Sequence, residues 1–510
     1  MNANCASQAF LERTQIIAIS FNHTFPIGKI RSYWEDTGCL DNGWGLVRDL
    51  YIYFLWSFME KNLACMCCLL LFFLFGCTSS VTVDGSTEYQ TMDGFGACEF
   101  GNYPKPTYYP VIFDELGIDV LRFQMYPRLE PVNDNDDPFV IDWNNVDINS
   151  LVEPLNYTGV DCGYGGVAPV LKAAHDRGIK LVGSIWSPPA WMKTNGNTIG
   201  GKLSPGLEDE FSEFLVIWIK GMERYHGVHI NSISIQNEPS YSQLWESCVY
   251  SQNELRDVIK VVGARFAAEG IKTKIHGPDT QNLTLFTSYS NAILNDPVAN
   301  GYVDTLASHT YSSTCFKKNW EAAYAVSSSN NKKLWMTEYA WNKNPIEVVH
   351  NALYYGNVNA YFLWELFGLP GGFVEYERKT VTCPYIGPNK YYYNFKQFSY
   401  FIKPGAIRIC TTSDDNNILV TSFIHKTDND FIIVAINKGL FNKNVDFTIN
   451  SVSGISALDI YRTSDTENTL NLGQINISGN SFSYIIPKNS TTTFTGKINC
   501  IQEKLGVGPS

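Results

Sequence analysis

From residue 91 to residue 403, short apolar runs alternate with longer segments that have helical periodicity. The eight apolar runs are 91–99, 119–127, 179–189, 230–239, 271–279, 303–311, 332–340 and 359–367. Between them, segments such as 167–178, 210–227 and 253–270 repeat their apolar residues every three to four positions and end in glycine. Eight strands that alternate with helices predict an α/β fold, a (β/α)8 TIM barrel over 91–403.

After residue 404 the pattern changes to short alternating runs separated by Asn, Ser, Thr and Gly, for example NILVTSFIH (417–425) and DFIIVAINK (430–438). This pattern predicts a β-sandwich over 404–498. The stretch 80–90, before the barrel, alternates in the same way and is predicted to be a strand that joins the sandwich. Residues 499–510 are predicted to be a tail. A chain of 510 residues is long enough for both domains.

The N-terminal region contains a run of fourteen apolar residues, LACMCCLLLFFLFG, at 63–76. This length is typical of an export signal and short for a membrane span. We therefore predict an export signal over 59–79, similar to a bacterial lipoprotein signal, with Cys77 as the candidate lipidation site. Phe75 is unusual in such a signal, which leaves a released form open. The expected location is secreted or on the cell surface, including an outer-membrane lipoprotein. Residues 1–58 resemble neither a signal nor a folded domain, and we interpret them as an uncertain extension upstream of the true start.

Composition excludes some partners and favours others. The formal net charge is −12, so there is no basic excess for a nucleic acid. Aromatic residues make up 14% of the chain, which suits stacking against sugar rings. None of the seven cysteines after Cys77 falls in a Cys-x-x-Cys pair, and the chain has no His-Glu-x-x-His motif. No cofactor or metal is predicted, and a membrane is expected only through the N-terminal anchor.

Two glutamates follow the fourth and seventh predicted strands: Glu238 in SIQNEPSY and Glu338 in LWMTEYAW. The ends of these strands lie across the mouth of a barrel, on the face where TIM-barrel enzymes place their active sites. A pair of carboxylates is what glycoside hydrolysis requires, one as acid and base and the other as nucleophile. Asn237 stands next to Glu238 and can hydrogen-bond a sugar hydroxyl. Pro239 ends the strand.

Several motifs together resemble glycoside hydrolase family 30 in order and over about residues 80–500. They are GFGA (94–97), LRFQMYPR (121–128), WSPPAWMKTNG (186–196), SIQNEPSY (234–241), ASHTY (307–311), LWMTEYAW (334–341) and FKQFSYFIKPGAIRI (395–409). The resemblance implies a retaining hydrolase whose barrel is fused to a β-sandwich completed by a strand from before the barrel.

The resemblance also implies site roles. Glu238 corresponds to the acid/base and Glu338 to the nucleophile. Tyr311 is expected to hold Glu338 by a hydrogen bond, and Arg122 is expected to lie near it. Four residues are expected to line the subsite of the cleaved sugar: Trp186, Asn237, Tyr311 and Trp364. Trp191 either stacks on a sugar or packs, and His309 is interpreted as a structural histidine.

The segment after Glu238 is most similar to the bacterial xylanase branch of the family, which implies endo cleavage of β-1,4 linkages in xylan. Many enzymes of that branch recognise a glucuronic acid side group through an Arg and a Tyr that follow the eighth barrel strand. Here Trp364 is followed by ELFGLPGG, so we predict no strict glucuronic acid dependence, unless Arg378 reaches in from the longer loop. The alternatives are a β-glucosidase or glucosylceramidase, a β-1,6-glucanase, and a non-catalytic surface glycan-binding protein. The tyrosines at 385 and 391–393 either flank a glycan cleft or cover the barrel end.

Overall fold

The computed structural model describes residues 78–99, 104, 106–153, 166–311, 316–340, 345–368, 374–376 and 385–498. The predicted export signal up to Cys77, the extension before it, Arg378 and the tail lie outside these residues. No helix in the described ranges is both long enough and apolar enough to cross a membrane.

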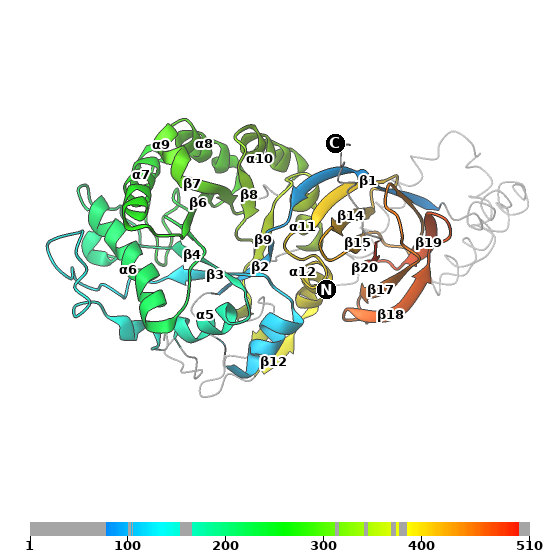
Figure 1. Cartoon of the computed structure of the whole chain (residues 1–510), viewed down its shortest axis with the longest axis horizontal. Helices are drawn as coiled ribbons and strands as arrows, with labels where there is room; N and C mark the ends of the chain where they lie inside the picture. Colours follow the sequence, from blue (N-terminus) through cyan, green and yellow to red (C-terminus); the bar gives the residue numbers. More distant parts are fainter. Residues whose placement is uncertain are drawn as a thin grey trace, which may run out of the picture. The chain divides into compact units, whose positions relative to one another are not determined.

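Eight parallel strands form a closed barrel, which confirms the predicted fold class (Figure 1). They are β2 (Gly94–Glu99), β3 (Val120–Met125), β4 (Lys180–Ile185), β5 (Ser232–Ser234), β6 (Lys274–Thr280), β7 (Val303–Ser308), β8 (Lys333–Met336) and β9 (Ala360–Leu363). The barrel closes because β2 pairs with both β3 and β9. Gly96 is required on β2, since an added Cβ would clash with the carbonyl oxygen of Val120. The last strand ends earlier than the run 359–367 suggested.

Helices surround the barrel, as Figure 1 shows for α5 to α10. They are α5 (Val167–His175), α6 (Glu208–His226), α7 (Gln252–Glu269), α8 (Leu283–Leu294), α9 (Pro297–Tyr302), α10 (Lys317–Ser329), α11 (Pro345–Tyr354) and α12 (Lys390–Ser399). Local sequence fixes their ends: α7 begins with a reciprocal cap between Ser251 and Glu254, and it ends at Gly270, whose φ of 66° favours glycine. Short 3-10 or π turns lie at Pro106–Tyr108, Pro110–Glu115, Ile148–Leu151 and Ala190–Met192.

The second domain is one nine-stranded sheet in the order β18-β17-β20-β15-β14-β13-β1-β16-β19. Its strands are β1 (Ser79–Thr91), β13 (Ile407–Ser413), β14 (Ile418–His425), β15 (Asp430–Asn437), β16 (Lys443–Asn450), β17 (Ala457–Thr463), β18 (Leu470–Asn476), β19 (Ser481–Ile486) and β20 (Ser490–Lys497). Phe447 on β16 and Phe494 on β20 have ring centroids 5.4 Å apart, although four strands lie between β16 and β20. The sheet therefore curls over an aromatic core into two layers. The strand that precedes the barrel completes it, since β1 pairs with β13 on one side and β16 on the other.

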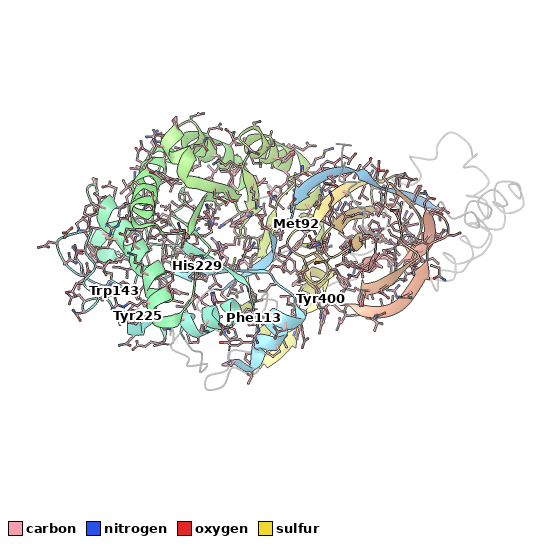
Figure 2. All side chains as sticks on the ribbon, in the orientation of Figure 1. Met92, Phe113, Trp143, Tyr225, His229 and Tyr400 are labelled. Atoms are coloured by element: carbon pink, nitrogen blue, oxygen red, sulfur yellow. The ribbon has the colours of Figure 1, made fainter. Side chains whose placement is uncertain are left out.

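The barrel and the sheet domain are joined by buried hydrogen bonds. Met92, labelled in Figure 2, donates its amide to the carbonyl of Ala406 and accepts from the amide of Gly405, each at 2.8 Å. From α12, Gln397 donates to Thr463 and accepts from Thr493. The first turn of α12 buries Tyr392 completely, and the Tyr392 hydroxyl donates to the carbonyl of Val111. Tyr392 therefore packs in the interior and does not flank a cleft.

A small three-stranded sheet follows the barrel and was not predicted. It consists of β10 (Phe367–Gly368), β11 (Val374–Tyr376) and β12 (Tyr385–Pro388). Residue Phe367, which the sequence pattern assigned to the eighth barrel strand, instead begins β10.

Candidate active site

The two glutamates meet at the mouth of the barrel. Glu238 lies four residues beyond β5 and Glu338 two residues beyond β8. An oxygen of each carboxylate and a ring nitrogen of His309 all lie within 4.8 Å of one another, and all three residues are buried. Retaining glycosidases hold their carboxyl groups about 5 to 5.5 Å apart, whereas inverting enzymes need a wider gap to admit water. The spacing therefore favours a retaining arrangement.

Glu338 is held by two donors. Arg122 Nη1 donates to Oε2 at 2.8 Å, and the Tyr311 hydroxyl donates to Oε1 at 2.9 Å. Tyr311 lies three residues beyond β7, and its amide donates to the carbonyl of Gln281 (3.2 Å). Both donors stabilise the ionised carboxylate, which is the form that a nucleophile needs.

Glu238 has a different set of partners. Its Oε1 lies 3.0 Å from His309 Nδ1, and its Oε2 accepts from Gln243 Nε2 at 2.8 Å. The backbone of Glu238 has a φ of 49°, a conformation that a non-glycine residue adopts only at a cost. Its amide is fixed there by a hydrogen bond to the carbonyl of Asp279 (3.0 Å). The fold thus aims this carboxylate into the mouth at the expense of local strain.

Arg122 is the centre of the buried network. It is fully buried on β3, and besides Glu338 it donates from Nη2 to Asp279 Oδ2 (3.0 Å) and to Asn237 Oδ1 (2.7 Å). The Asn237 contact occupies the amide oxygen and leaves Nδ2 as the group that this side chain can offer to a ligand. The guanidinium carbon of Arg122 also lies 4.9 Å from the centroid of the Trp186 ring.

The charges in this network set the pKa values of its members. Burial raises the pKa of the Glu338 carboxyl, while His309 and Arg122 oppose that shift. Burial lowers the pKa of His309, but Glu338, Asp279 and Glu238 outweigh it and raise that pKa to about 10. Burial also raises the pKa of Asp279, yet Arg122 and His309 bring it well below its usual range. The His309 ring lies between two carboxylates, with its Nδ1 3.0 Å from Glu238 Oε1 and its Nε2 3.6 Å from Asp279 Oδ1.

Glu238, His309 and Glu338 are also spaced as a metal site would be. In this structure the three residues contact one another directly: His309 Nδ1 lies 3.0 Å from Glu238 Oε1 and 3.8 Å from Glu338 Oε1.

The predicted tryptophans divide into two groups. Trp186 follows β4 and Trp364 follows β9, and their rings approach with centroids 6.2 Å apart beside Arg122. Trp191 is placed differently: its indole nitrogen donates to the backbone carbonyl of Glu130 (3.0 Å), and its ring packs against the core. Among the described residues, no hydrogen bond or ring contact joins Trp191 to either glutamate. This placement supports the interpretation that Trp191 packs against the core.

The loop after Glu238 contacts Glu238 and strand β3. Gln243 contacts Glu238, and Glu246 accepts a hydrogen bond from Gln124, a buried residue of β3. The buried Lys193 donates to Ser187 Oγ and to the carbonyls of Thr198 and Ser247, which ties this loop to the one after β4. Trp245 on the loop is half exposed.

We expect Tyr311→Phe to lower kcat/KM by about 10- to 100-fold, the worth of a hydrogen bond to a charged group. Loss of this donor raises the pKa of Glu338 further. Because attack requires the ionised form, the acidic limb of the pH profile moves to higher pH. Steady-state rates measured across pH test this shift, and Tyr324→Phe, a change on the outer helix α10, is the control. A lower rate without displacement of the acidic limb would contradict the assignment.

Two parts of the network escaped sequence reasoning. The sequence assigned no role to Asp279 or to Gln243. Asp279 follows Pro278 at an irregular step in the ladder and has a φ of 57°. An Asp directly after a Pro at the end of a strand is the signal that could have found it.

Comparisons with known proteins agree on the family. The model of the glycosyl hydrolase family 30 TIM-barrel domain matches residues 165–339, which include both glutamates. "Glucuronoxylanase XynC" of Bacillus subtilis (strain 168) is 28% identical over 341 residues, covering 63% of this chain and 75% of that protein. The crystal structure of a glycoside hydrolase family 30 subfamily 8 xylanase, Xyn30A from Clostridium acetobutylicum, matches with a TM-score of 0.67 and 25% identity, over 82% of this chain and 99% of that one.

Other branches are also similar. "Putative glucosylceramidase 4" of Caenorhabditis elegans is 26% identical over 64% of this chain and 67% of that protein. "Endo-1,6-beta-D-glucanase neg1" of Aspergillus fumigatus is 28% identical over 46% of this chain and 52% of that protein.

Proposed function

This chain belongs to glycoside hydrolase family 30 and is a glycoside hydrolase, and we propose that it cleaves β-1,4 linkages within xylan by a retaining double displacement. The observation that carries the mechanism is the pair of buried carboxylates within 4.8 Å, each with its own set of donors. Glu338 is the nucleophile because Arg122 and Tyr311 favour its ionised form. Glu238 is the acid/base.

The proposed reaction has two steps. Glu338 attacks the anomeric carbon while Glu238 transfers its proton to the glycosidic oxygen, so the C–O bond to the leaving sugar breaks and a glycosyl ester forms. Glu238, now a carboxylate, takes a proton from water, which attacks the same carbon and releases Glu338. His309 contacts Oε1 of Glu238 and the uncharged amide of Gln243 donates to Oε2, and we assign both proton transfers to Oε2. Two inversions leave the configuration unchanged.

Recognition of the cleaved sugar is assigned to the residues around this pair. Trp186 and Trp364 offer aromatic faces, and the Asn237 amide offers a donor for a sugar hydroxyl, held in place by Arg122. A hydrogen bond that strengthens as positive charge develops on the sugar lowers the barrier.

Xylan is the favoured polymer because XynC and the Clostridium enzyme, both named as xylanases, are similar over three quarters or more of their own length. Dependence on glucuronic acid is not expected. Beside Trp364 lies Glu365, whose pKa is raised to about 8 by burial and by the charge of Glu338. Glu365 is not a cation, so it offers an anionic sugar no ion-pair partner.

The alternative functions differ in what they require of the site. A β-1,6-glucanase or a glucosylceramidase shares the carboxylate pair and differs in the shape around it. A non-catalytic glycan-binding protein has no need of two carboxylates held by separate donors, so this arrangement disfavours it. We also propose export, on the basis of the segment 59–79, with Cys77 either lipidated or removed.

The product profile tests the substrate assignment. The chain from Ser79 onward is given glucuronoxylan, an unsubstituted or arabinosylated xylan, and β-1,6-glucan. We expect xylo-oligosaccharides of several lengths from both xylans at similar rates. Cleavage of glucuronoxylan alone would mean that another residue, such as Arg378, reads the acid. Activity on the glucan alone would overturn the xylan assignment and leave the retaining mechanism in place.

A further inference from the structure

A second group of buried carboxylates lies away from the two catalytic candidates. Glu130 follows β3, and Glu210 and Glu213 lie in the first two turns of α6. One carboxylate oxygen of each lies within 4.8 Å of the others. Glu130 and Glu213 are fully buried, and Glu210 is 8% exposed. The proposed hydrolysis uses none of them.

Several oxygens in this group have no hydrogen-bond partner among the described residues. They are Glu130 Oε2, Asn133 Oδ1, Asp134 Oδ1, Glu210 Oε2, and both Oε1 and Oε2 of Glu213. Buried carboxylate oxygens without donors are costly, and three carboxylates in contact add mutual repulsion. Oxygens that converge in this way require protons or a cation between them.

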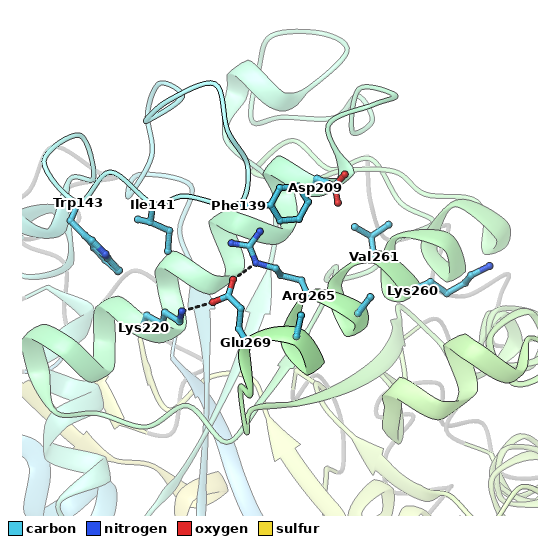
Figure 3. Close-up of a pocket in the computed structure, with 11 residues that line it drawn as sticks. Phe139, Ile141, Trp143, Asp209, Lys220, Lys260, Val261, Arg265 and Glu269 are labelled. Carbon is cyan, nitrogen blue, oxygen red and sulfur yellow. Dashed lines mark hydrogen bonds and ion pairs between the residues drawn. The ribbon is translucent and has the colours of Figure 1, made fainter.

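Burial and neighbouring carboxylates raise the pKa of Glu213, and the basic group that opposes this rise is Arg265 of α7. Its own contacts point elsewhere: its guanidinium donates to Glu269 and to the carbonyl of Pro138, and it lies 5.0 Å from the centroid of the Phe139 ring. Figure 3 shows Arg265 paired with Glu269, which also binds Lys220. No ion pair between described residues joins a Lys or Arg to Glu130, Glu210 or Glu213, so the cluster has no direct counter-charge there.

We infer that Glu130, Glu210 and Glu213, with Asp134 and Asn133, form a binding site for one divalent cation, and that the cation is calcium. Calcium prefers six to eight oxygen ligands at 2.3 to 2.6 Å, so two of its ligands lie at most about 5 Å apart. The spacing of the carboxylates meets this condition. The absence of nitrogen or sulfur ligands from the set favours a hard cation over zinc or copper.

The site would fasten the long loop after β3 to α6. Within the loop, the amide of Asp142 donates to Asp134 Oδ2, and the side chain of Asn145 donates to the carbonyl of Asp134 (2.7 Å). Farther along, Phe139, Ile141 and Trp143 form one wall of a surface groove of about 860 Å³ against α6 and α7 (Figure 3). Trp143 also packs on Tyr225 of α6, with ring centroids 5.8 Å apart (Figure 2). A cation at the base would hold this whole wall in place.

The carbonyl of Glu130 also accepts the hydrogen bond from Trp191, so the cluster contacts the short turn after β4. This inference does not depend on which polysaccharide is cleaved.

Protonation is the competing way to keep these carboxyls together. Burial raises the pKa of Glu130 to about 9 and that of Glu213 to about 8. If the carboxyl groups of Glu130 and Glu213 are protonated, the protein binds no cation at neutral pH.

The experiment measures calcium binding and thermal unfolding on the full-length protein after treatment with a chelator. Isothermal titration with Ca²⁺ is expected to give one ion per chain, and excess Ca²⁺ should raise the unfolding midpoint by about 5 °C. Glu213→Gln and the less buried Glu210→Gln should lose both effects. Glu321→Gln, which changes an exposed carboxylate on α10, should keep them. A wild-type protein that binds no Ca²⁺ and whose midpoint is the same in chelator and in Ca²⁺ would overturn the inference. So would one bound ion in both Glu213→Gln and Glu210→Gln.

Discussion

Glu338→Gln is expected to lower kcat on xylan by on the order of 10⁴- to 10⁶-fold, because an amide cannot form the glycosyl ester and loses the charge that favours the oxocarbenium ion. The fold should survive the change. Arg122 keeps its ion pair with Asp279 and its contact with Asn237, so the buried guanidinium is not left alone. Circular dichroism and the unfolding midpoint check this point.

Chemical rescue separates a nucleophile from a residue that only supports one. In Glu338→Ala the space of the carboxylate is open to azide, which should restore turnover of an activated aryl xyloside and give a glycosyl azide of inverted configuration. Residual activity within tenfold of wild type in Glu338→Gln, or a rescue product of retained configuration, would show that Glu338 is not the nucleophile.

The order of strands and helices explains why the carboxylate pair could be predicted from sequence. Glu238 and Glu338 each stand just past an apolar run, and in a barrel of parallel strands every such position faces the same mouth. The local pattern around each residue was therefore enough, although exactly 100 positions separate them in the chain. The resemblance to family 30 implied that Arg122 lies near Glu338, and Arg122 Nη1 is 2.8 Å from Glu338 Oε2.

Features that depend on long-range packing were not predictable in this way. Asp279 binds Arg122 only because a ladder irregularity and a positive φ turn it inward. His309 was interpreted as structural, and the structure places its ring between Glu238 and Asp279. The carboxylates of Glu210 and Glu213 lie on α6, where an amphipathic pattern assigns acidic residues of the first turns to solvent or to the helix dipole. In the folded chain they lie beside Glu130 of the loop after β3.

Glu238→Gln is expected to lower kcat on xylan by about 10²- to 10⁴-fold, since the leaving sugar must then depart without a proton. The loss should depend on the leaving group. An aryl xyloside whose phenol is acidic needs no protonation, so its first step should stay near the wild-type rate, and the glycosyl-enzyme should accumulate because water is no longer activated. Rapid-mixing measurements would then show a burst of phenol equal to the enzyme concentration. The same substrate gives no burst with Glu338→Gln, which makes the two variants controls for one another. An equal loss on both substrates would mean that Glu238 positions the sugar and does not transfer the proton.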